Sequence, residues 1–289
     1  MKIIESIEEM QRYSIQLRGK GKTLANVSTT GFLHKGHLHL VDIAKENADE
    51  VVLNIDHIDT YRKFKQEPHK YDRYLDEYRT EQLDKDLDLC EKHGVNIFFH
   101  PDIHEVYTVQ AYKVHANIKK LRQAYKGIQF VDPVISKSNL KDFNMMMPDI
   151  IMMGQKDIIQ NLEAQYMITD FNYPIKMIMA PIVRESDGLA SSSRLERLSE
   201  SARKDARSIY ESLKEAEEWV QQPDGPSIGD IKDHIRHKIT KANGQINYIV
   251  ICCAVTLEEL RYFDRKAVIV IEATFGDIPL SDNIIIEPK

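Results

Sequence analysis

Short apolar runs alternate with amphipathic stretches along the first two thirds of this 289-residue chain. Five runs, several of them apolar on both faces, predict β-strands at residues 23–28, 50–55, 95–100, 149–154 and 175–183. The stretches between them have helical spacing and predict α-helices at residues 37–47, 71–93, 107–125 and 157–170. Strands without a polar face, in alternation with helices, are typical of a parallel sheet covered by helices on both sides.

The pattern changes in the last third of the chain. Apolar residues recur along one face of a predicted helix at 196–220, and the turn-forming stretch "QQPDGPSIGD" follows it. The next predicted elements are a helix at 228–242 and strands at 246–255 and 266–276. We therefore expect a parallel α/β domain at residues 1–184 and a smaller α+β C-terminal domain at residues 185–289.

Composition limits the partners of the protein. The formal net charge is -6, so the chain lacks the excess of basic residues that is typical of a nucleic-acid-binding protein. No apolar run approaches the roughly eighteen residues that a membrane span needs, and acidic residues interrupt the N-terminal segment where a secretion signal is apolar. The three cysteines form no CxxC pair, which fits a reducing compartment. These features predict a cytoplasmic protein with neither nucleic acid nor membrane as a partner.

The stretch "STTGFLHKGHLHL", residues 28–40, runs from the end of the first predicted strand into the first predicted helix. Gly31 and Gly36 let the backbone pass close to a ligand, and a helix that begins near Gly36 points free N–H groups at it. His34 and His37 are three residues apart, so both imidazoles can face one way and donate hydrogen bonds to anionic oxygens. The pattern is typical of a phosphate-binding loop, and equally of a turn in which both histidines cap or pack.

A second candidate loop follows the predicted strand at 149–154. In "MMGQKDIIQ", Lys156 offers a positive charge for phosphate, and Asp157 offers the hard oxygen ligand that Mg2+ prefers. The alternative for this pair is a solvated lysine beside an aspartate that caps the next helix.

A third candidate loop, "PIVRESDGLASSSR", brings hydroxyls and a guanidinium just past the predicted strand at 175–183. Its polar residues are Ser191, Ser192, Ser193 and Arg194. Such groups suit a polyphosphate, whereas the alternative is a serine-rich cap for the following helix. Because ligands bind at the carboxyl ends of strands in parallel sheets, three such loops favour a phosphate site over three unrelated turns.

The order of "TGFLHKGH", "GQKD" and "PIVRESDGLASSSR", with the closing "ATFGDIPLSDNI", resembles the pantothenate synthetase, or pantoate–β-alanine ligase, family over nearly the whole chain. The third motif is the most specific of these. The resemblance implies a Rossmann-like, nucleotidyltransferase-type catalytic domain with a C-terminal lid domain, in a homodimer. It also implies a two-step ligation. ATP and a carboxylic acid form an acyl adenylate and pyrophosphate, and an amine then attacks the acyl carbon to give an amide and AMP.

The resemblance also implies roles for individual residues. His37 would be the catalytic histidine that stabilises or protonates phosphate oxygens, and Asp157 would hold Mg2+. The residues that would share the phosphates with His37 are His34, Lys156, Ser192, Ser193 and Arg194. The full set of implied ATP-binding residues is Thr30, Gly31, His34, His37, Gly154, Gln155, Lys156, Asp157, Val183, Ser191, Ser192, Ser193 and Arg194.

The residues expected at the acid substrate depart from the family. Gln160 matches the family glutamine that holds the acid, but "NIDHIDTYRKF" lacks the second substrate glutamine, and Tyr61 lies nearest its place. Thr30 stands where the family has methionine, Ser28 where it has proline, and Gln155 where it has glutamate. We expect Gln160, Thr30 and Tyr61 at the acid. Since one changed polar partner alters substrate discrimination by orders of magnitude, the motifs indicate adenylation more strongly than they indicate pantoate and β-alanine.

The function that these features favour is ATP-dependent ligation of an acid to an amine, with pantothenate synthesis from pantoate and β-alanine as its first form. One alternative is a paralogue that keeps the adenylating residues and joins a different acid or amine. A second is a nucleotidyltransferase that stops at the nucleotidyl product, and a third is a nucleotide-binding protein without catalysis.

Overall fold

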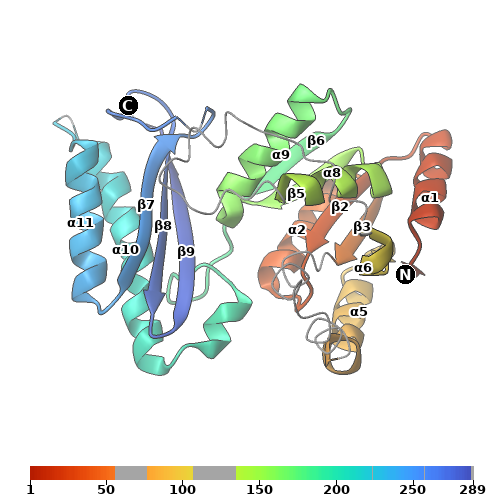
Figure 1. Ribbon diagram of the computed structural model, residues 1–289, viewed down its shortest axis with the longest axis horizontal. Helices are drawn as coiled ribbons and strands as arrows, with labels where there is room; N and C mark the ends of the chain where they lie inside the picture. Colours follow the sequence, from red (N-terminus) through yellow and green to blue (C-terminus); the bar gives the residue numbers. More distant parts are fainter. Residues whose placement is uncertain (56–76, 107–134, 223, 257, 288–289) are drawn as a thin grey trace. The chain divides into compact units, whose positions relative to one another are not determined.

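The computed structural model describes residues 1–55, 77–106, 135–222, 224–256 and 258–287 (Figure 1). The described residues belong to two compact units, of which unit 1 ends at Ala180 and unit 2 begins at Pro181. The domain boundary expected between residues 184 and 185 stays a prediction. Within the described ranges, no helix is both long enough and apolar enough to span a membrane.

Unit 1 is built on a six-stranded sheet. Its strands are β1 (Lys2–Ile4), β2 (Leu24–Thr29), β3 (Glu50–Ile55), β4 (Ile97–Phe99), β5 (Ile150–Gly154) and β6 (Lys176–Ala180). They lie in the order β1-β4-β3-β2-β5-β6, and neighbouring strands are parallel. The predicted parallel α/β fold is confirmed. From β2 the chain builds outward through β3 and β4 on one side and through β5 and β6 on the other, so the switch in strand order falls between β2 and β5.

Helices pack on both faces of this sheet. The face that carries Val27 and Leu53 packs against α2 (Lys35–Asn47) and α5 (Leu83–Lys92). The face that carries Leu24 and Val52 packs against α1 (Ile7–Gly19) and α8 (Ile135–Met146). The other short elements of unit 1 are η1 (Tyr78–Gln82), α6 (Ile103–Val106), η3 (Gln155–Asp157) and α9 (Ile158–Asp170).

Unit 2 is an antiparallel sheet with two long helices on one face, which confirms the smaller α+β fold. The strands β7 (Gln245–Cys253), β8 (Ala267–Phe275) and β9 (Ile278–Ile286) lie in sequence order. A short turn η4 (Ser193–Arg197) precedes α10 (Glu200–Val220), and α11 (Ile228–Lys241) follows. Figure 1 shows both long helices beside the blue sheet, and their apolar faces share one core with it.

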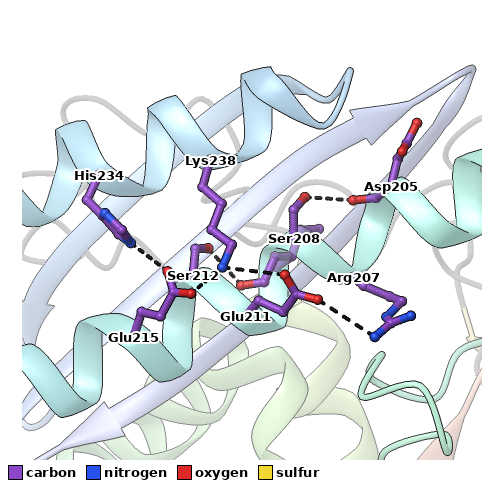
Figure 2. A network of polar contacts seen from close by, with 9 residues as sticks. Asp205, Arg207, Ser208, Glu211, Ser212, Glu215, His234 and Lys238 are labelled. Atoms are coloured by element: carbon purple, nitrogen blue, oxygen red, sulfur yellow. Dashed lines mark hydrogen bonds and ion pairs between the residues drawn. The ribbon is translucent and has the colours of Figure 1, made fainter.

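A network of charged side chains joins α10 to α11 (Figure 2). Glu215 accepts a hydrogen bond from His234 at 2.8 Å and also pairs with Lys238, which lies 3.4 Å from Glu211. Arg207 extends the network at 3.8 Å from Glu211. Because these side chains are partly exposed, each pair adds little stability, and the apolar core that α10 and α11 share holds the two helices together.

Several elements differ from the predictions made from the pattern. β6 ends at Ala180 instead of residue 183, because Pro181 has no N–H to donate to the sheet. The helix expected from residue 196 begins at Glu200, where the Ser199 hydroxyl accepts a hydrogen bond from the Ala202 N–H. The pattern did not predict β1, α1, α8 or β9. The helix expected at 107–125 and the start of the one expected at 71–93 lie outside the described residues.

Candidate active site

The turn between β2 and α2 holds its two histidines in a fixed arrangement. His34 occupies the N-cap of α2, and its Nδ1 accepts a hydrogen bond from the Gly36 N–H at 3.1 Å. The His37 Nδ1 accepts in turn from the His34 N–H at 3.4 Å, and the two ring centroids are 3.9 Å apart. A neutral imidazole that accepts at Nδ1 carries its proton on Nε2. The histidines thus do cap α2, as the alternative for this turn expected. Because each Nδ1 is used as an acceptor, the Nε2 of each neutral ring is a hydrogen-bond donor.

The surroundings of His37 keep its ring neutral. Burial, followed by the nearby His34 and by the positive charge of Lys156, lowers the pKa of His37 from 6.5 to about 3. Lys156 belongs to the second candidate loop, which follows β5, the parallel neighbour of β2. At neutral pH the site thus presents a neutral N–H donor next to an ammonium group, which suits a ligand that brings several negative charges.

A buried aspartate from α5 holds the backbone of this turn. The Asp86 side chain is fully buried and accepts hydrogen bonds from the N–H groups of Phe32 at 2.9 Å and Leu33 at 3.0 Å. It also accepts from the Tyr78 hydroxyl and the Gln82 amide, each at 2.9 Å. Four donors compensate the carboxylate for its burial, so Asp86 anchors the turn that carries both histidines.

Gly31 is required by the packing of the same turn. Its φ is +80°, and a Cβ at this position would lie 2.6 Å from Cε2 of the buried Tyr78. Any larger residue would be strained and would push Tyr78 away. The glycine thus serves the close approach of the turn to Tyr78, while Thr30 beside it is exposed.

The second candidate loop forms the turn η3 between β5 and α9. Lys156 lies 3.9 Å from the Asp157 carboxylate, whose side chain is half exposed. Asp157 occupies the N-cap position of α9 but makes no capping hydrogen bond, which argues against the capping alternative. A Cβ on Gly154 would meet nothing within 4 Å, so open space lies beside this residue. Gln155 follows it in η3, and Gln160 lies half-buried in the first turn of α9.

The first two loops meet because their strands are neighbours. β2 pairs with β5 in parallel register, with Val27 opposite Met152, so the turns that follow both strands leave the sheet at the same edge. This edge lies at the switch in strand order, where ligands bind in open α/β sheets. The topology therefore brings the paired histidines and Lys156 into one site.

The third candidate loop belongs to unit 2. The Ser192 hydroxyl accepts from the Arg194 N–H at 3.2 Å and caps η4, so the serine-cap alternative is observed for this residue. The buried Ser191 donates its N–H to the Val183 carbonyl at 2.8 Å, and Ser193 is exposed. The exposed Arg194 donates from its guanidinium to the Pro279 carbonyl at 3.2 Å. Through its backbone carbonyl, which accepts from Ser191, Val183 holds the two ends of the loop together.

Two expected features of the site have no described geometry. Tyr61 lies outside the described residues. The structure, where it describes the chain, contains no group of three or more histidine, cysteine or acidic side chains arranged to hold a metal ion. Asp157 stays the predicted ligand of Mg2+, and it would need water and phosphate oxygens to complete the coordination.

The fold defines a class, the doubly wound α/β proteins that are followed by a small antiparallel α+β unit. Comparison with known families narrows this class, because the family model described as "Pantoate-beta-alanine ligase" matches residues 2–285. The chain belongs to the pantoate–β-alanine ligase family, whose members are ligases that form carbon–nitrogen bonds. The family resemblance expected from the three motifs is confirmed.

Individual relatives agree with this membership. A protein named pantothenate synthetase from Thermotoga petrophila is 35% identical over 292 residues, which are 99% of this chain and 100% of the relative. Another of that name from Caldicellulosiruptor bescii is 32% identical over 294 residues and covers 100% of both chains. The solved pantothenate synthetase of Thermus thermophilus superposes with a TM-score of 0.82 at 25% identity, with 100% of both chains covered.

The sequence motifs did not include three polar residues that the structure places at the carboxyl edge of the sheet or against the turn between β2 and α2. Asp86 was overlooked although it lies four residues before the buried Cys90, on the apolar side of its helix, where an unpaired carboxylate would be costly. Asn54 interrupts the apolar run at 50–55 in the same way, and it is buried. Asp142 is also buried, but it lies on α8, which the pattern did not predict, so only Asp86 and Asn54 had a signal in the sequence.

Proposed function

We propose that this protein is an ATP-dependent ligase that joins a carboxylic acid to an amine through an acyl adenylate. What supports the proposal is that the turn with His34 and His37 and the turn with Lys156 follow the paired parallel strands β2 and β5, at the switch in strand order of the sheet. In a chain of this family, that combination of N–H donors and an ammonium group fits the phosphates of ATP.

The first step moves an adenylyl group to the acid. A carboxylate oxygen attacks the α-phosphorus of ATP, the bond to the bridging oxygen breaks, and pyrophosphate leaves with that electron pair. Negative charge shifts onto phosphate oxygens, where the Nε2–H of His37 and the ammonium of Lys156 would stabilise it. Mg2+ at Asp157 would supply further positive charge to the phosphates. His34 would add a second N–H donor.

The second step releases the amide. The amine nitrogen attacks the acyl carbon, the bond from that carbon to the AMP oxygen breaks, and the nitrogen loses a proton as AMP departs. Gln160, in the first turn of α9, would hold the acid, with Thr30 and Tyr61 beside it. We further propose that the unit 2 residues Val183, Ser191, Ser192, Ser193 and Arg194 contact ATP, together with Gly31, Gly154 and Gln155 of unit 1, and that the protein acts as a homodimer.

The proposed reaction takes one acid and one amine as substrates. Pantoate and β-alanine, for which the family is named, are the first pair to test. A second candidate, a ligase of a different acid, is favoured by one observation: Ser28 hydrogen-bonds to the buried Asp142 at the end of β2. This contact makes the sheet edge polar.

Acid-dependent exchange of pyrophosphate with ATP tests the proposal. His37→Ala and Lys156→Ala should each lower the exchange rate by at least about 100-fold, because each removes a group that stabilises transition-state charge. His39→Ala, on the same helix, is the matched control and should retain the rate. Circular dichroism should show all three variants folded. Near-normal exchange in both active-site variants would overturn the mechanism, and a nucleotide retained in the final product would indicate a nucleotidyltransferase instead.

A further inference from the structure

A cluster of buried polar side chains lies at the carboxyl ends of β2 and β3. The Asp142 carboxylate, 4% exposed on α8, accepts hydrogen bonds from the Ser28 hydroxyl at 3.1 Å and from the Asn54 amide nitrogen at 3.5 Å. Ser28 and Asn54 are direct neighbours in the register of β2 and β3. Helix and sheet therefore meet here through polar groups, whereas their contact further along α8 is apolar.

Buried polar atoms in this cluster, and beside it on β2 and α8, have no hydrogen-bond partner. Asn54 is 2% exposed, and its Oδ1 has no hydrogen-bond partner. Asn26 lies two residues before Ser28 on the same face of the strand, and its Oδ1 also has no hydrogen-bond partner. On α8, the Nδ2 of Asn139 is also buried without a partner, one turn before Asp142. Such atoms cost free energy unless a ligand or an ordered water satisfies them.

The position of the cluster points to a ligand. Asp142 contacts the last residues of β2, and the chain continues from there through Thr30 to the histidine turn. α8 precedes the parallel strand β5, so its N-terminal part, with Asn139, lies toward the carboxyl edge of the sheet, where ligands bind. Asn139 and Asp142, at helical spacing of three residues, share one side of the helix.

The unused atoms define the chemistry of that ligand. Two are acceptors, the Oδ1 atoms of Asn26 and Asn54, and one is a donor, the Nδ2 of Asn139. A hydroxyl group both donates and accepts, so it can satisfy atoms of both kinds, whereas an ammonium group cannot accept from Asn139. A methyl group would leave all of them unsatisfied and cover a carboxylate.

We propose that Ser28, Asn54, Asn139 and Asp142 form the specificity-determining wall of the acid site and select an acid that carries hydroxyl groups where pantoate carries its two methyl groups. The inference rests on the proposed adenylation and names its acid class. Pantoate would fit poorly, since its dimethyl carbon would meet this polar wall.

Binding and exchange measured on the same set of acids test the wall. The probes are pantoate and erythronate, a four-carbon acid with hydroxyls on each carbon beyond the carboxylate, together with an amino analogue of erythronate. With Mg2+ and ATP present, erythronate should show a kcat/KM for exchange at least about tenfold above that of pantoate, and it should bind more tightly by calorimetry. Asp142→Asn, which keeps the side-chain shape, should narrow this ratio several-fold. The double variant Ser28→Pro/Asp142→Leu should reverse it.

The outcomes separate the two proposals. Asn144→Ser, at an exposed position of the same helix, is the control and should leave the ranking of the acids unchanged. Preference of the wild-type protein for pantoate or for the amino acid would overturn the wall, and so would an unchanged erythronate-to-pantoate ratio in Asp142→Asn. If erythronate binds preferentially while no acid supports exchange, the wall stands and the proposed adenylation fails.

Discussion

Glu163 shows how a single residue ties the stability of unit 1 to pH. Its side chain on α9 is 1% exposed, and no donor in the described part of the chain reaches its Oε2. Burial raises the pKa of Glu163 from 4.5 to about 7. Between these values the folded protein holds a proton that the unfolded chain releases, so the free energy of unfolding falls as pH rises from 4.5 through 7.

Glu163→Gln should remove this dependence. The variant has no charge to bury, so at pH 8 it should be more stable than the wild type by about 3 kcal/mol, the equivalent of the pKa difference. At pH 4.5 the two proteins should differ little. Urea unfolding at a series of pH values measures the effect, with Asp170→Asn at the exposed end of the same helix as the control. Equal slopes of stability against pH in wild type and variant would contradict the prediction.

Single residues also show what the sequence could reveal of the site. His34, His37 and Lys156 could be found because their spacing after apolar runs is a local pattern. Asp86, Asn54 and Asp142 could not be assigned from local pattern alone. Asp86 contacts Phe32, which is 54 positions away in the chain. Asp142 contacts Asn54 at a separation of 88 positions and Ser28 at a separation of 114. Only the folded sheet makes those pairs neighbours.

At the scale of elements, local signals predicted the central strands and failed at the edges. β2, β3 and β5 carry buried apolar residues on both faces, and their ends were predicted to within one residue. α1 was missed because its buried residues are few and include Ser14, so its apolar face is narrow. β9, "IPLSDNIII", alternates buried and partly exposed residues only over residues 278–282, and Pro279, Ser281 and Asp282 obscure the strand pattern there.

The turn between β2 and α2 depends on α5 as much as on its own sequence. Asp86→Asn should lower kcat/KM for ATP in the exchange reaction by about 100-fold and destabilise the protein by about 3 kcal/mol, because the amide cannot accept all four hydrogen bonds. Tyr78→Phe, which keeps both bonds to the turn backbone, should destabilise the protein with a much smaller kinetic effect.

The control for this prediction is Asp88→Asn, whose exposed side chain pairs with Lys92 on the same helix. It should leave both kcat/KM and stability within error of the wild type. If Asp86→Asn retained full kcat/KM for ATP, the anchoring role would be wrong even though the protein had lost stability.

At the scale of the whole molecule, each unit has its own hydrophobic core. In unit 2 the guanidinium of Arg184 binds the buried Asp282 carboxylate through two bonds, at 2.7 and 3.1 Å, and stacks on Tyr210 at 3.8 Å. The single tryptophan of the chain, Trp219, lies in α10 of the same unit. Its fluorescence therefore reports on unit 2, whereas far-ultraviolet circular dichroism reports on both units.

Asp282→Asn should separate the unfolding of the two units. Loss of the carboxylate leaves Arg184 without its partner in a mostly buried position and should destabilise unit 2 by about 2–3 kcal/mol. The fluorescence midpoint in urea should fall, while part of the dichroism signal should keep the wild-type midpoint. Asp264→Asn, in an exposed pair with Arg265, should move neither signal. Coincident shifts of both probes in Asp282→Asn would show that the two cores unfold as one.

The neutral state of His37 has a consequence for how the protein meets a charged ligand. A ring with a pKa of about 3 is held in that state by burial, by the nearby His34 and by the positive charge of Lys156. A polyanion bound against it reverses the sign of the local potential and raises that pKa. Under the proposed adenylation, nucleotide binding would then be linked to proton uptake. Acid would strengthen binding, and the leaving pyrophosphate would carry away the charge that held the proton. The histidine turn would act as a proton reservoir whose filling is set by the progress of the reaction.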